Sequence, residues 1–421
     1  MMKKLLFTLL AMILILCLPW AMAEEKPAYE YIGQYGVEGA VVVKRDGLYG
    51  LLDAKGQEVF PCQWRGINYS YHNLLPVSYN GVTWGVIDME GNTVLPFQWE
   101  TVRILEDGSY EVQRGGLWGL LDAQGQQVIP CEYRSIRSLG EGMYEVGVST
   151  SEGLLHALFR GGEQATDFCL YYVDSYYHHD RVVVYDAQGR IHVLNGQGEV
   201  VFSLEAYTAA LSEDVPLILA HNPDGSAQFY DLDGNPVGER WDSAGFFYNG
   251  LARVERSGKF GFIGTDGQLA IPLVYDNAWD FSEGLALVGQ GEEIYWIDTQ
   301  GNRGADWHYA GGREYVRGVA LVMDDAGLYG LIDRTGALIT TCQWQNIREN
   351  PMFYAPFTRG SYAWAVSQEG ASLIALDGSI VTGDRYFDWL EDTLVLQGDY
   401  AFVLEEATGE VTIWNMDGQV W

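Results

Sequence analysis

The stretch G-L-W-G-L-L-D at residues 116–122 decides the fold, because four further stretches of the chain repeat its pattern. In each copy an aromatic residue precedes a glycine, two apolar residues follow, and a turn then ends in another glycine. Copies of one pattern at a regular distance predict a tandem-repeat protein. The aromatic-glycine pairs are Tyr49-Gly50, Trp84-Gly85, Trp118-Gly119, Phe260-Gly261 and Tyr329-Gly330.

A second aromatic residue follows the first in every copy, and the spacing between the two is identical in all five. An apolar-proline step lies between the two aromatic anchors in four of the copies, at Pro61, Pro96, Pro130 and Pro272. Because they recur at fixed places in the repeat, these aromatic residues are predicted to be core positions. The anchor pairs are Tyr49/Trp64, Trp84/Trp99, Trp118/Tyr133, Phe260/Tyr275 and Tyr329/Trp344.

The glycines that end the turns mark eleven units of similar length, within the range that is typical of repeat architectures. The units around Gly162 and Gly198 are degenerate, so any domain boundary is expected near residues 150–215. We therefore divide the chain into a first half, residues 24–210, and a second half, residues 211–421. The turn glycines are Gly56, Gly91, Gly125, Gly162, Gly198, Gly234, Gly267, Gly301, Gly336, Gly378 and Gly418.

Each unit is predicted to consist of about three short strands. The residues after the aromatic-glycine pair alternate in polarity, and the Asp-x-x-Gly tetrapeptide is a turn, since Asp bonds nearby backbone and Gly adopts positive φ. Two further strands follow, for example at residues 251–254 and 285–288. No segment beyond the N-terminal leader has a helical stripe with caps, so the protein is expected to be all-β.

The whole pattern resembles the WG-repeat family, also called KWG repeats. The family's closing element, F-x-x-G-L-A-x-V, is present at residues 247–254 and 281–288. The resemblance implies a bacterial, β-rich repeat protein that is often exported. It implies no defined activity and no catalytic residues.

Two architectures fit such an array, because one unit cannot bury its apolar faces alone. One is a β-propeller-like arrangement, as a single large ring or as two propellers that divide near residue 210. The alternative is an open superhelical β-solenoid. Residues 40–44 resemble a strand of an incomplete unit, and residues 411–421 supply only first strands. Pairing of these two ends would close a ring and remove exposed strand edges.

Residues 1–23 have the features of a signal peptide. Lys3 and Lys4 form a basic start, residues 5–18 are apolar, and Ala21-Met22-Ala23 fits the small-x-small pattern of a cleavage site. The segment predicts export to the cell envelope or beyond, with cleavage after Ala23 and no membrane insertion afterwards. The net charge of −32 also argues against nucleic acid as a partner.

Several residue types that often carry chemistry have simpler explanations here. Cys62, Cys131 and Cys342 occupy one repeat position that also accepts Phe97 and Leu273, so they are predicted to be buried thiols rather than disulfides. The Asp-Gly turns lack the ligand spacing of a calcium loop. No nucleophile elbow and no phosphate loop is present, so no catalytic residue, metal or cofactor is predicted.

The most unusual local composition is at residues 171–180, in the degenerate region. We take Tyr171, Tyr172, Tyr176, Tyr177, His178 and His179 as a speculative binding surface. Aromatic residues outside the repeat pattern are predicted to lie on loops, where they suit sugar or peptide contacts. These are Tyr69, Tyr71, Tyr79, Tyr248, Trp279, Trp307, Tyr354 and Trp389.

Three functions are compatible with the sequence. The first is a non-catalytic binding or scaffold protein that recognises a protein, peptide or cell-surface glycan. The second is a glycan-active enzyme with two separated carboxylates in a pocket. The third is a structural spacer without a ligand.

The leader makes one direct prediction. We expect the protein secreted from a bacterial host to begin at Glu24, because signal peptidase reads the small residues at positions 21 and 23. Intact-mass measurement checks this, and a secreted protein that retains residues 1–23 would contradict it.

Overall fold

The two aromatic anchors of each copy face each other across a pair of antiparallel strands. In the computed structural model, Tyr49 pairs with Trp64, Trp84 with Trp99, and Trp118 with Tyr133. The pairs Phe260/Tyr275 and Tyr329/Trp344 are formed in the same way. The predicted anchors are confirmed, since their constant spacing sets the register of one hairpin. The structure describes residues 28–33, 39–151, 153–173, 177–306, 309–348, 362–383, 386–387, 393–397 and 400–415.

The anchor glycine is required because the partner strand passes directly over it. A β-bulge follows each anchor pair, where the register shifts. A Cβ atom on Gly85 would lie 2.8 Å from the carbonyl oxygen of Leu95, and one on Gly119 would lie 2.8 Å from the amide nitrogen of Cys131. The prolines occupy this irregular part of the strand, where a missing N–H is tolerated.

The strands form ten antiparallel sheets in the described residues, and one sheet is double, which gives eleven blades. Chain order equals strand order within a blade, so each blade is a simple meander. Blades 1 to 3 contain β1 (Tyr31–Gly33), β2 (Ala40–Arg45), β3 (Leu48–Asp53), β4 (Glu58–Trp64), β5 (Gly66–Ile67), β6 (Leu75–Ser78), β7 (Trp84–Ile87), β8 (Thr93–Trp99), β9 (Thr101–Ile104), β10 (Tyr110–Arg114), β11 (Leu117–Leu121) and β12 (Gln127–Tyr133).

Blades 4 and 5 form the double sheet, because β15 pairs directly with β17 through His156 and Leu170. This is the stretch whose units are degenerate in sequence. The fourth strand of blade 4 is reduced to Glu163–Gln164, so the first strand of blade 5 takes part of its place. The strands are β13 (Ser135–Gly140), β14 (Met143–Thr150), β15 (Gly153–Arg160), β16 (Glu163–Gln164), β17 (Leu170–Val173), β18 (Arg181–Asp186), β19 (Ile191–Asn195) and β20 (Val200–Leu204).

Blades 6 to 9 return to the regular four-stranded pattern. Their strands are β21 (Thr208–Leu211), β22 (Leu217–His221), β23 (Ala227–Asp231), β24 (Pro236–Trp241), β25 (Ser243–Tyr248), β26 (Leu251–Arg256), β27 (Lys259–Gly264), β28 (Leu269–Tyr275), β29 (Asn277–Ala278), β30 (Leu285–Gln290), β31 (Glu293–Asp298), β32 (Arg303–Asp306), β33 (Gly311–Val316), β34 (Val319–Met323), β35 (Tyr329–Asp333) and β36 (Leu338–Trp344).

Blades 10 and 11 show three strands each in the described residues. They are β37 (Asn346–Arg348), β38 (Tyr362–Val366), β39 (Ala371–Ala375), β40 (Thr393–Gln397), β41 (Tyr400–Glu405) and β42 (Glu410–Asn415). The described part of the chain consists of strands and turns, and it contains no helix that is long and apolar enough to cross a membrane.

The prediction of three strands per unit was one strand short. The missing element is the first strand of each blade, which is very short in β5 and β29. Such a short strand cannot show an alternating pattern of polarity, so it leaves no signal in the sequence.

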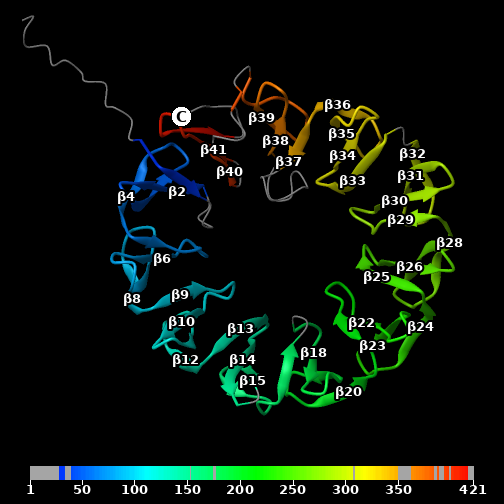
Figure 1. The fold of residues 1–421 in the computed structure, drawn as a ribbon, viewed down its shortest axis with the longest axis horizontal. Coiled ribbons are helices and arrows are strands. Elements are labelled where there is room, and N and C mark those ends of the chain that lie inside the picture. The colour runs from blue at the N-terminus through cyan, green and yellow to red at the C-terminus, as the bar shows by residue number, and fades with distance from the viewer. Residues whose placement is uncertain are drawn as a thin grey trace, which may run out of the picture.

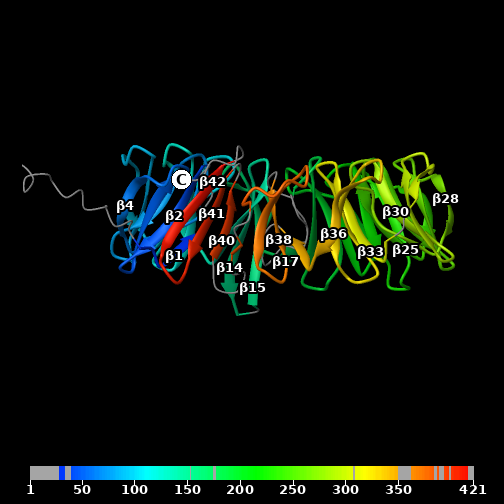
Figure 2. The same ribbon diagram turned by 90° about the horizontal axis from the view of Figure 1, so that it is seen from above.

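The eleven blades form one ring around a wide central opening (Figure 1). Seen from the side the ring is a flat band of roughly even height, with the β14–β15 hairpin projecting below it (Figure 2). The first strand of each blade lies nearest the opening and the last strand forms the outer surface (Figure 1). The single large ring is therefore the architecture that the chain adopts, and the open solenoid is not.

Blade 1 packs against blade 11 and closes the ring. Tyr29 donates its backbone N–H to the carbonyl oxygen of Gly409 at 2.7 Å, and one core cluster joins Ile32 and Val41 with Phe402 and Ile413. The predicted pairing of the chain ends was wrong for the described residues. Residues 40–45 are β2, paired with β1 and β3, whereas β42 pairs with β41.

Neighbouring blades are joined by the same contacts one repeat length apart. Gly284 donates its N–H to Asn249 Oδ1, and Gly318 donates to Glu283 Oε2. Apolar cores fill the spaces between blades. The predicted boundary after residue 210 falls inside β21, where a core cluster joins Val183 and Ile191 with Leu211 and Ile218. The two halves are thus continuous arcs of one ring.

Substitution of the anchor glycine tests this packing. We expect Gly85→Ala to lower the free energy of unfolding by roughly 1–3 kcal/mol, because the new methyl group would overlap backbone that cannot move aside. Gly289→Ala is the control, since its Cβ would meet Asn277 at an ordinary 3.5 Å. Urea unfolding followed by tryptophan fluorescence measures both, and equal losses would contradict the explanation.

Candidate functional site

The predicted binding segment is divided between an exposed strand and a turn in which Tyr177 is buried. Tyr171 and Tyr172 lie on β17 with 64% and 49% of their surface exposed. Both are exposed because the pairing of β17 with β18 shifts register between Leu170 and Tyr172. These two tyrosines are therefore available to a partner. Tyr176 lies outside the described residues.

Tyr177, His178 and His179 form the turn between β17 and β18, and of these only Tyr177 was assigned wrongly to a contact surface, because it is buried. His178 is half-buried and His179 is exposed. Tyr177 is buried, and its hydroxyl donates to Asp180 Oδ1 at 2.5 Å. His179 and Asp180 both have positive φ, as a tight two-residue hairpin turn requires. His179 Nε2 lies 3.3 Å from the carbonyl oxygen of Glu213 in the next blade.

A signal for this turn was present in the sequence. The segment Tyr177-His178-His179-Asp180-Arg181 occupies the place that Phe281-Ser282-Glu283-Gly284-Leu285 holds in blade 8, where an identical isolated bridge forms. Tyr177 also precedes Phe247 by two repeat lengths. Among the residues that the structure describes, no group of three His, Cys, Asp or Glu side chains is placed to hold a metal ion.

The exposed aromatic side chains are concentrated on and near the first strands of the blades. Of ten that the described residues contain, eight lie on the first strand of a blade or directly beside it. The exceptions are Tyr79 and Tyr386, whereas exposed aliphatic residues such as Val94, Val200 and Leu269 lie on the outer fourth strands. The eight are Tyr31, Tyr69, Tyr171, Tyr172, Tyr207, Phe246, Tyr248 and Trp279.

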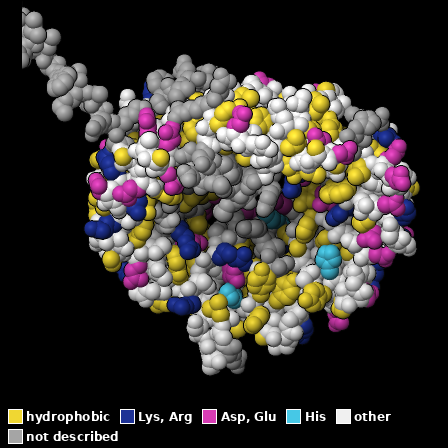
Figure 3. Space-filling model, turned by 45° about the horizontal axis from the view of Figure 1, so that its top comes forward, with side chains coloured by type: hydrophobic (Ala, Val, Ile, Leu, Met, Phe, Trp, Pro, Cys, Tyr) yellow, Lys and Arg dark blue, Asp and Glu magenta, His cyan; other side chains and the backbone are white. Residues whose placement is uncertain are grey.

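Six of these side chains come from four consecutive blades, and we call them the aromatic arc. The backbone of Tyr207 bonds to His221 and that of Trp279 bonds to Leu287, so both continue a first strand. The opening is seen as a hollow in the space-filling view (Figure 3). The arc consists of Tyr171 and Tyr172 in blade 5, Tyr207 in blade 6, Phe246 and Tyr248 in blade 7, and Trp279 in blade 8.

Part of the prediction for off-pattern aromatic residues is correct. Tyr69, Tyr79 and Trp279 are exposed on loops, as predicted, and two of these loops follow the first strands β5 and β29. Tyr248 is exposed too, but it ends the first strand β25. Tyr71 is half-buried. Trp307, Tyr354 and Trp389 lie outside the described residues.

A small cavity of about 180 Å³ lies within the arc, between blades 6 and 7. Phe246 and Tyr248 line one side of it, and Glu213 and Asp214 line the other. Both carboxylates are exposed, and neither has an ion pair among the described residues. The arc therefore offers aromatic faces next to negative charge.

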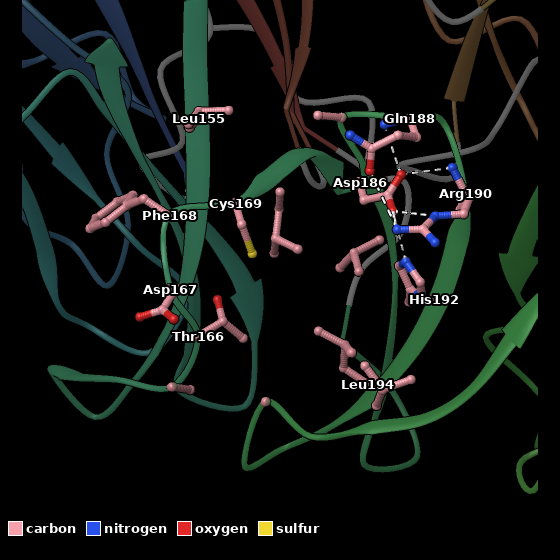
Figure 4. Close-up of a pocket in the computed structure, with 16 residues that line it drawn as sticks. Leu155, Thr166, Asp167, Phe168, Cys169, Asp186, Gln188, Arg190, His192 and Leu194 are labelled. Atoms are coloured by element: carbon pink, nitrogen blue, oxygen red, sulfur yellow. Dashed lines mark hydrogen bonds and ion pairs between the residues drawn. The ribbon is translucent and has the colours of Figure 1, made fainter. Parts of the chain in front are cut away.

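A larger cavity of about 730 Å³ lies between blades 4 and 5 (Figure 4). It exists because β16 is too short to fill the space of a fourth strand. Leu155, Phe168 and Leu194 are among its apolar residues, and the loop with Thr166 and Cys169 faces a polar group across it (Figure 4). Its volume lies within the range of about 300–1,000 Å³ that small-molecule sites occupy.

The polar group in this cavity is centred on Asp186. Its Oδ2 accepts from Arg190 Nε at 2.7 Å and lies 3.2 Å from His192 Nε2. Partial burial alone would raise the pKa of Asp186, but the backbone and guanidinium of Arg190 and the ring of His192 outweigh it and hold that pKa well below its usual range. The carboxylate is therefore ionised at any physiological pH.

A serine, a histidine and an aspartate are in contact here, yet the arrangement lacks the electrostatics of a hydrolase. His192 Nδ1 lies 2.7 Å from Ser203 Oγ, and its other nitrogen faces Asp186. In a catalytic triad the carboxylate stabilises the imidazolium that forms during catalysis. Asp186 is already paired with Arg190 through the same oxygen, which weakens that stabilisation.

Two buried glutamates occupy one repeat position on the second strands of blades 3 and 4. Glu111 has a long contact of 3.5 Å with Arg103 and accepts a hydrogen bond from the backbone of Ser138, but burial outweighs both and raises its pKa. Glu145 contacts Arg137 at 2.6 Å and His156 Nδ1 at 2.9 Å. Burial alone would raise the pKa of Glu145 too, but its partners outweigh that and lower it. Each acid contacts a side chain on a neighbouring strand of its own blade, and both are buried.

The cysteines in the described residues are free thiols, as the repeat position predicted. Cys62, Cys131 and Cys342 are partly buried against core clusters, and burial raises the pKa of each thiol. Cys169 is exposed at the large cavity.

Comparison with known proteins identifies the repeat. The model of a family described as "WG containing repeat" matches residues 49–82, 84–118, 118–148, 229–260 and 260–293. The resemblance read from the sequence is thereby confirmed. The copy at Tyr329 and Trp344 lies outside these matches but forms the same anchor pair. No curated protein matches the chain.

Solved structures that resemble this ring have low sequence identity to it. A eukaryotic initiation factor is 11% identical with a TM-score of 0.39, and the match covers 74% of this chain and 94% of that one. BamB from Moraxella catarrhalis is 12% identical with a TM-score of 0.32, covering 76% and 99%. The designed Ika8 protein is 13% identical with a TM-score of 0.31, covering 73% and 96%.

The two buried glutamates give a matched test of the electrostatics. We expect Glu145→Gln to lower the free energy of unfolding at neutral pH by roughly 1–3 kcal/mol, because it breaks a buried ion group. Glu111→Gln is expected to leave stability unchanged or to raise it by up to about 1 kcal/mol, since a poorly paired buried charge disappears.

The pH dependence has opposite signs for the two residues. The lowered pKa of Glu145 means that its stabilisation is present above the unfolded-state pKa and is lost as the pH falls through the folded-state pKa. The raised pKa of Glu111 means that the folded state favours its protonated form. Its contribution to the free energy of unfolding is therefore most favourable at acid pH and is lost as the pH rises through the folded-state pKa. Thermal unfolding across pH 3–8 measures both, and shifts of the same sign would contradict this account.

Proposed function

We propose that this chain, a WG-repeat protein, is a non-catalytic binding scaffold that acts outside the cytoplasm and holds its partner against the aromatic arc. The partner is a protein, peptide or glycan chain that reaches the central opening. The ring supplies a rigid frame, and the first strands supply the contacting side chains.

The observation that carries the proposal is the segregation of exposed aromatic residues to the first strands. Leaving one such side chain in water forgoes about 1.5–3 kcal/mol of burial. A repeat protein has no structural reason to accept that cost on four consecutive blades. Exposed apolar surface of this kind typically marks an interaction site, and Tyr and Trp are the residues that dominate such contacts.

The acids near the arc favour binding over hydrolysis. A glycoside hydrolase needs one carboxyl group held in its protonated form by its surroundings, opposite a second carboxylate. Glu213 and Asp214 are neighbours on one loop, and both are exposed. The enzyme alternative therefore has less support than a binding role.

Action outside the cytoplasm rests on the N-terminal pattern. Residues 1–23 lie outside the described part of the structure, and the ring starts after them. The acidic surface suits a soluble extracytoplasmic protein that avoids nucleic acid and anionic lipid.

Substitution within the arc tests the proposal. We expect the triple variant Tyr207→Ser, Tyr248→Ser, Trp279→Ser to capture at least tenfold less partner from cell-envelope extract than the wild type. Removal of several aromatic contacts costs more than about 1.4 kcal/mol of binding free energy. Immobilised wild-type and variant rings are compared by quantifying the bound protein and carbohydrate.

Tyr79→Ser is the control, because Tyr79 is exposed but lies away from the first strands. It is expected to capture as much partner as the wild type, and circular dichroism confirms that the triple variant is folded. Equal capture by the triple variant would refute the role of the arc. Failure of the wild type to capture anything would favour the spacer function.

A further inference from the structure

We infer that the aromatic arc recognises an extended basic polypeptide segment, whose Lys and Arg side chains contact the aromatic faces and the adjacent carboxylates. This inference rests on the proposed function and specifies the chemistry of the partner at the same site.

Unpaired negative charge accompanies the arc. Glu205, Glu213 and Asp214 are exposed beside Tyr207 or in the small cavity, and none has an ion pair within the described residues. The nearby cations are already engaged. Arg253 Nε contacts Asp280 at 3.2 Å, and Lys259 Nζ contacts Asp276 at 2.6 Å. A ligand therefore meets carboxylates that have no counter-charge of their own.

The aromatic side chains add a second attraction for the same groups. A Lys ammonium or Arg guanidinium over the face of Tyr or Trp gains about 0.5–2 kcal/mol. The protein already makes such contacts internally, since Arg256 lies 4.2 Å from the ring centroid of Trp241 and Arg114 lies 4.3 Å from that of Trp99. Aromatic faces flanked by free carboxylates thus favour cations over neutral groups.

Blades 2 to 4, which directly precede the arc in the ring, carry more cations near their first strands (Figure 1). The first strands of blades 2 to 4, with the residues directly before them, carry Arg65, Arg103, Arg134 and Arg137 but only one acid, Glu100. Arg103 contacts Glu111. Arg65 and Arg134 are exposed, whereas Arg137 is held by Glu145. The exposed Arg65 and Arg134 make blades 2 to 4 less favourable for a basic segment than blades 5 to 8.

The length of the arc requires an extended ligand. Its six side chains come from four consecutive blades, so no single residue contacts them all. A polypeptide that carries several cations along its length matches several sites at once. A neutral glycan would use the aromatic faces but would leave the free carboxylates without a counter-charge.

Defined probes test the inference on the full mature ring. They are a Lys-Gly repeat peptide, a Glu-Gly peptide of the same length, and a soluble neutral β-glucan. We expect only the Lys-Gly peptide to bind in isothermal titration calorimetry. Its affinity should fall at least tenfold between roughly 50 and 500 mM NaCl, because screening weakens exposed charge pairs.

Two double variants distinguish the effect of the acids at the site from the effect of the protein's total negative charge. The double variant Glu213→Gln, Asp214→Asn is expected to lower the affinity for the Lys-Gly peptide about fivefold to tenfold, because it neutralises two carboxylates next to the aromatic faces. Glu90→Gln with Asp325→Asn removes the same charge from exposed turns elsewhere and should leave the affinity unchanged. Equal losses in both double variants would overturn the inference.

Two further outcomes also overturn it. Binding of the β-glucan with no salt dependence would identify the arc as a glycan site. A partner captured from envelope extract that depends on the arc, together with no binding of the Lys-Gly peptide, would leave the proposed function standing and refute only the basic ligand.

Discussion

The close passage of the fourth strand over the anchor glycine is the constraint on which the ring depends. Only a residue without a side chain leaves room for the bulged strand, whose backbone would lie 2.6–3.0 Å from any added Cβ in the five regular copies. The bulge in turn places the second anchor aromatic opposite the first. A single local requirement therefore fixes the glycine, the proline and both aromatic anchors of the repeat.

The same requirement explains why cysteine occurs at one position of the repeat. Cys131 Sγ and Cys342 Sγ lie within 3.0 Å of where the glycine Cβ would be, so this position fills the space beside the bulge. Phe97 does the same above Gly85. What looks like redox chemistry in the sequence is packing around one tight crossing of two strands.

The parts of the blade that the glycine crossing constrains were the parts that could be predicted from the sequence. The sequence predicted the hairpin, its turn and its core residues, because two anchors at a constant spacing repeat there. It did not predict the first strands, since Gly66–Ile67 and Asn277–Ala278 are too short to show a period. Tyr177 was misassigned because its turn has no glycine, and Asp180 adopts the positive φ at the position that a glycine holds in blade 8. The ring closes by packing of blade 1 against blade 11 rather than by strand pairing of the chain ends. Such packing joins residues far apart in the chain, so no local sequence pattern predicts it.

A ring of eleven units has a further consequence for where binding is possible. Neighbouring blades pack mainly through their second to fourth strands, with single first-strand residues such as Phe247 and Ala278 joining the cores. A wide ring leaves the first strands at the edge of an open space (Figure 1). Short first strands limit the exposed backbone edge that would otherwise favour aggregation. Their side chains are also the ones least constrained by the glycine crossing. Variation can therefore accumulate there without loss of the fold, and it is there that the aromatic residues and the asymmetry of charge are found.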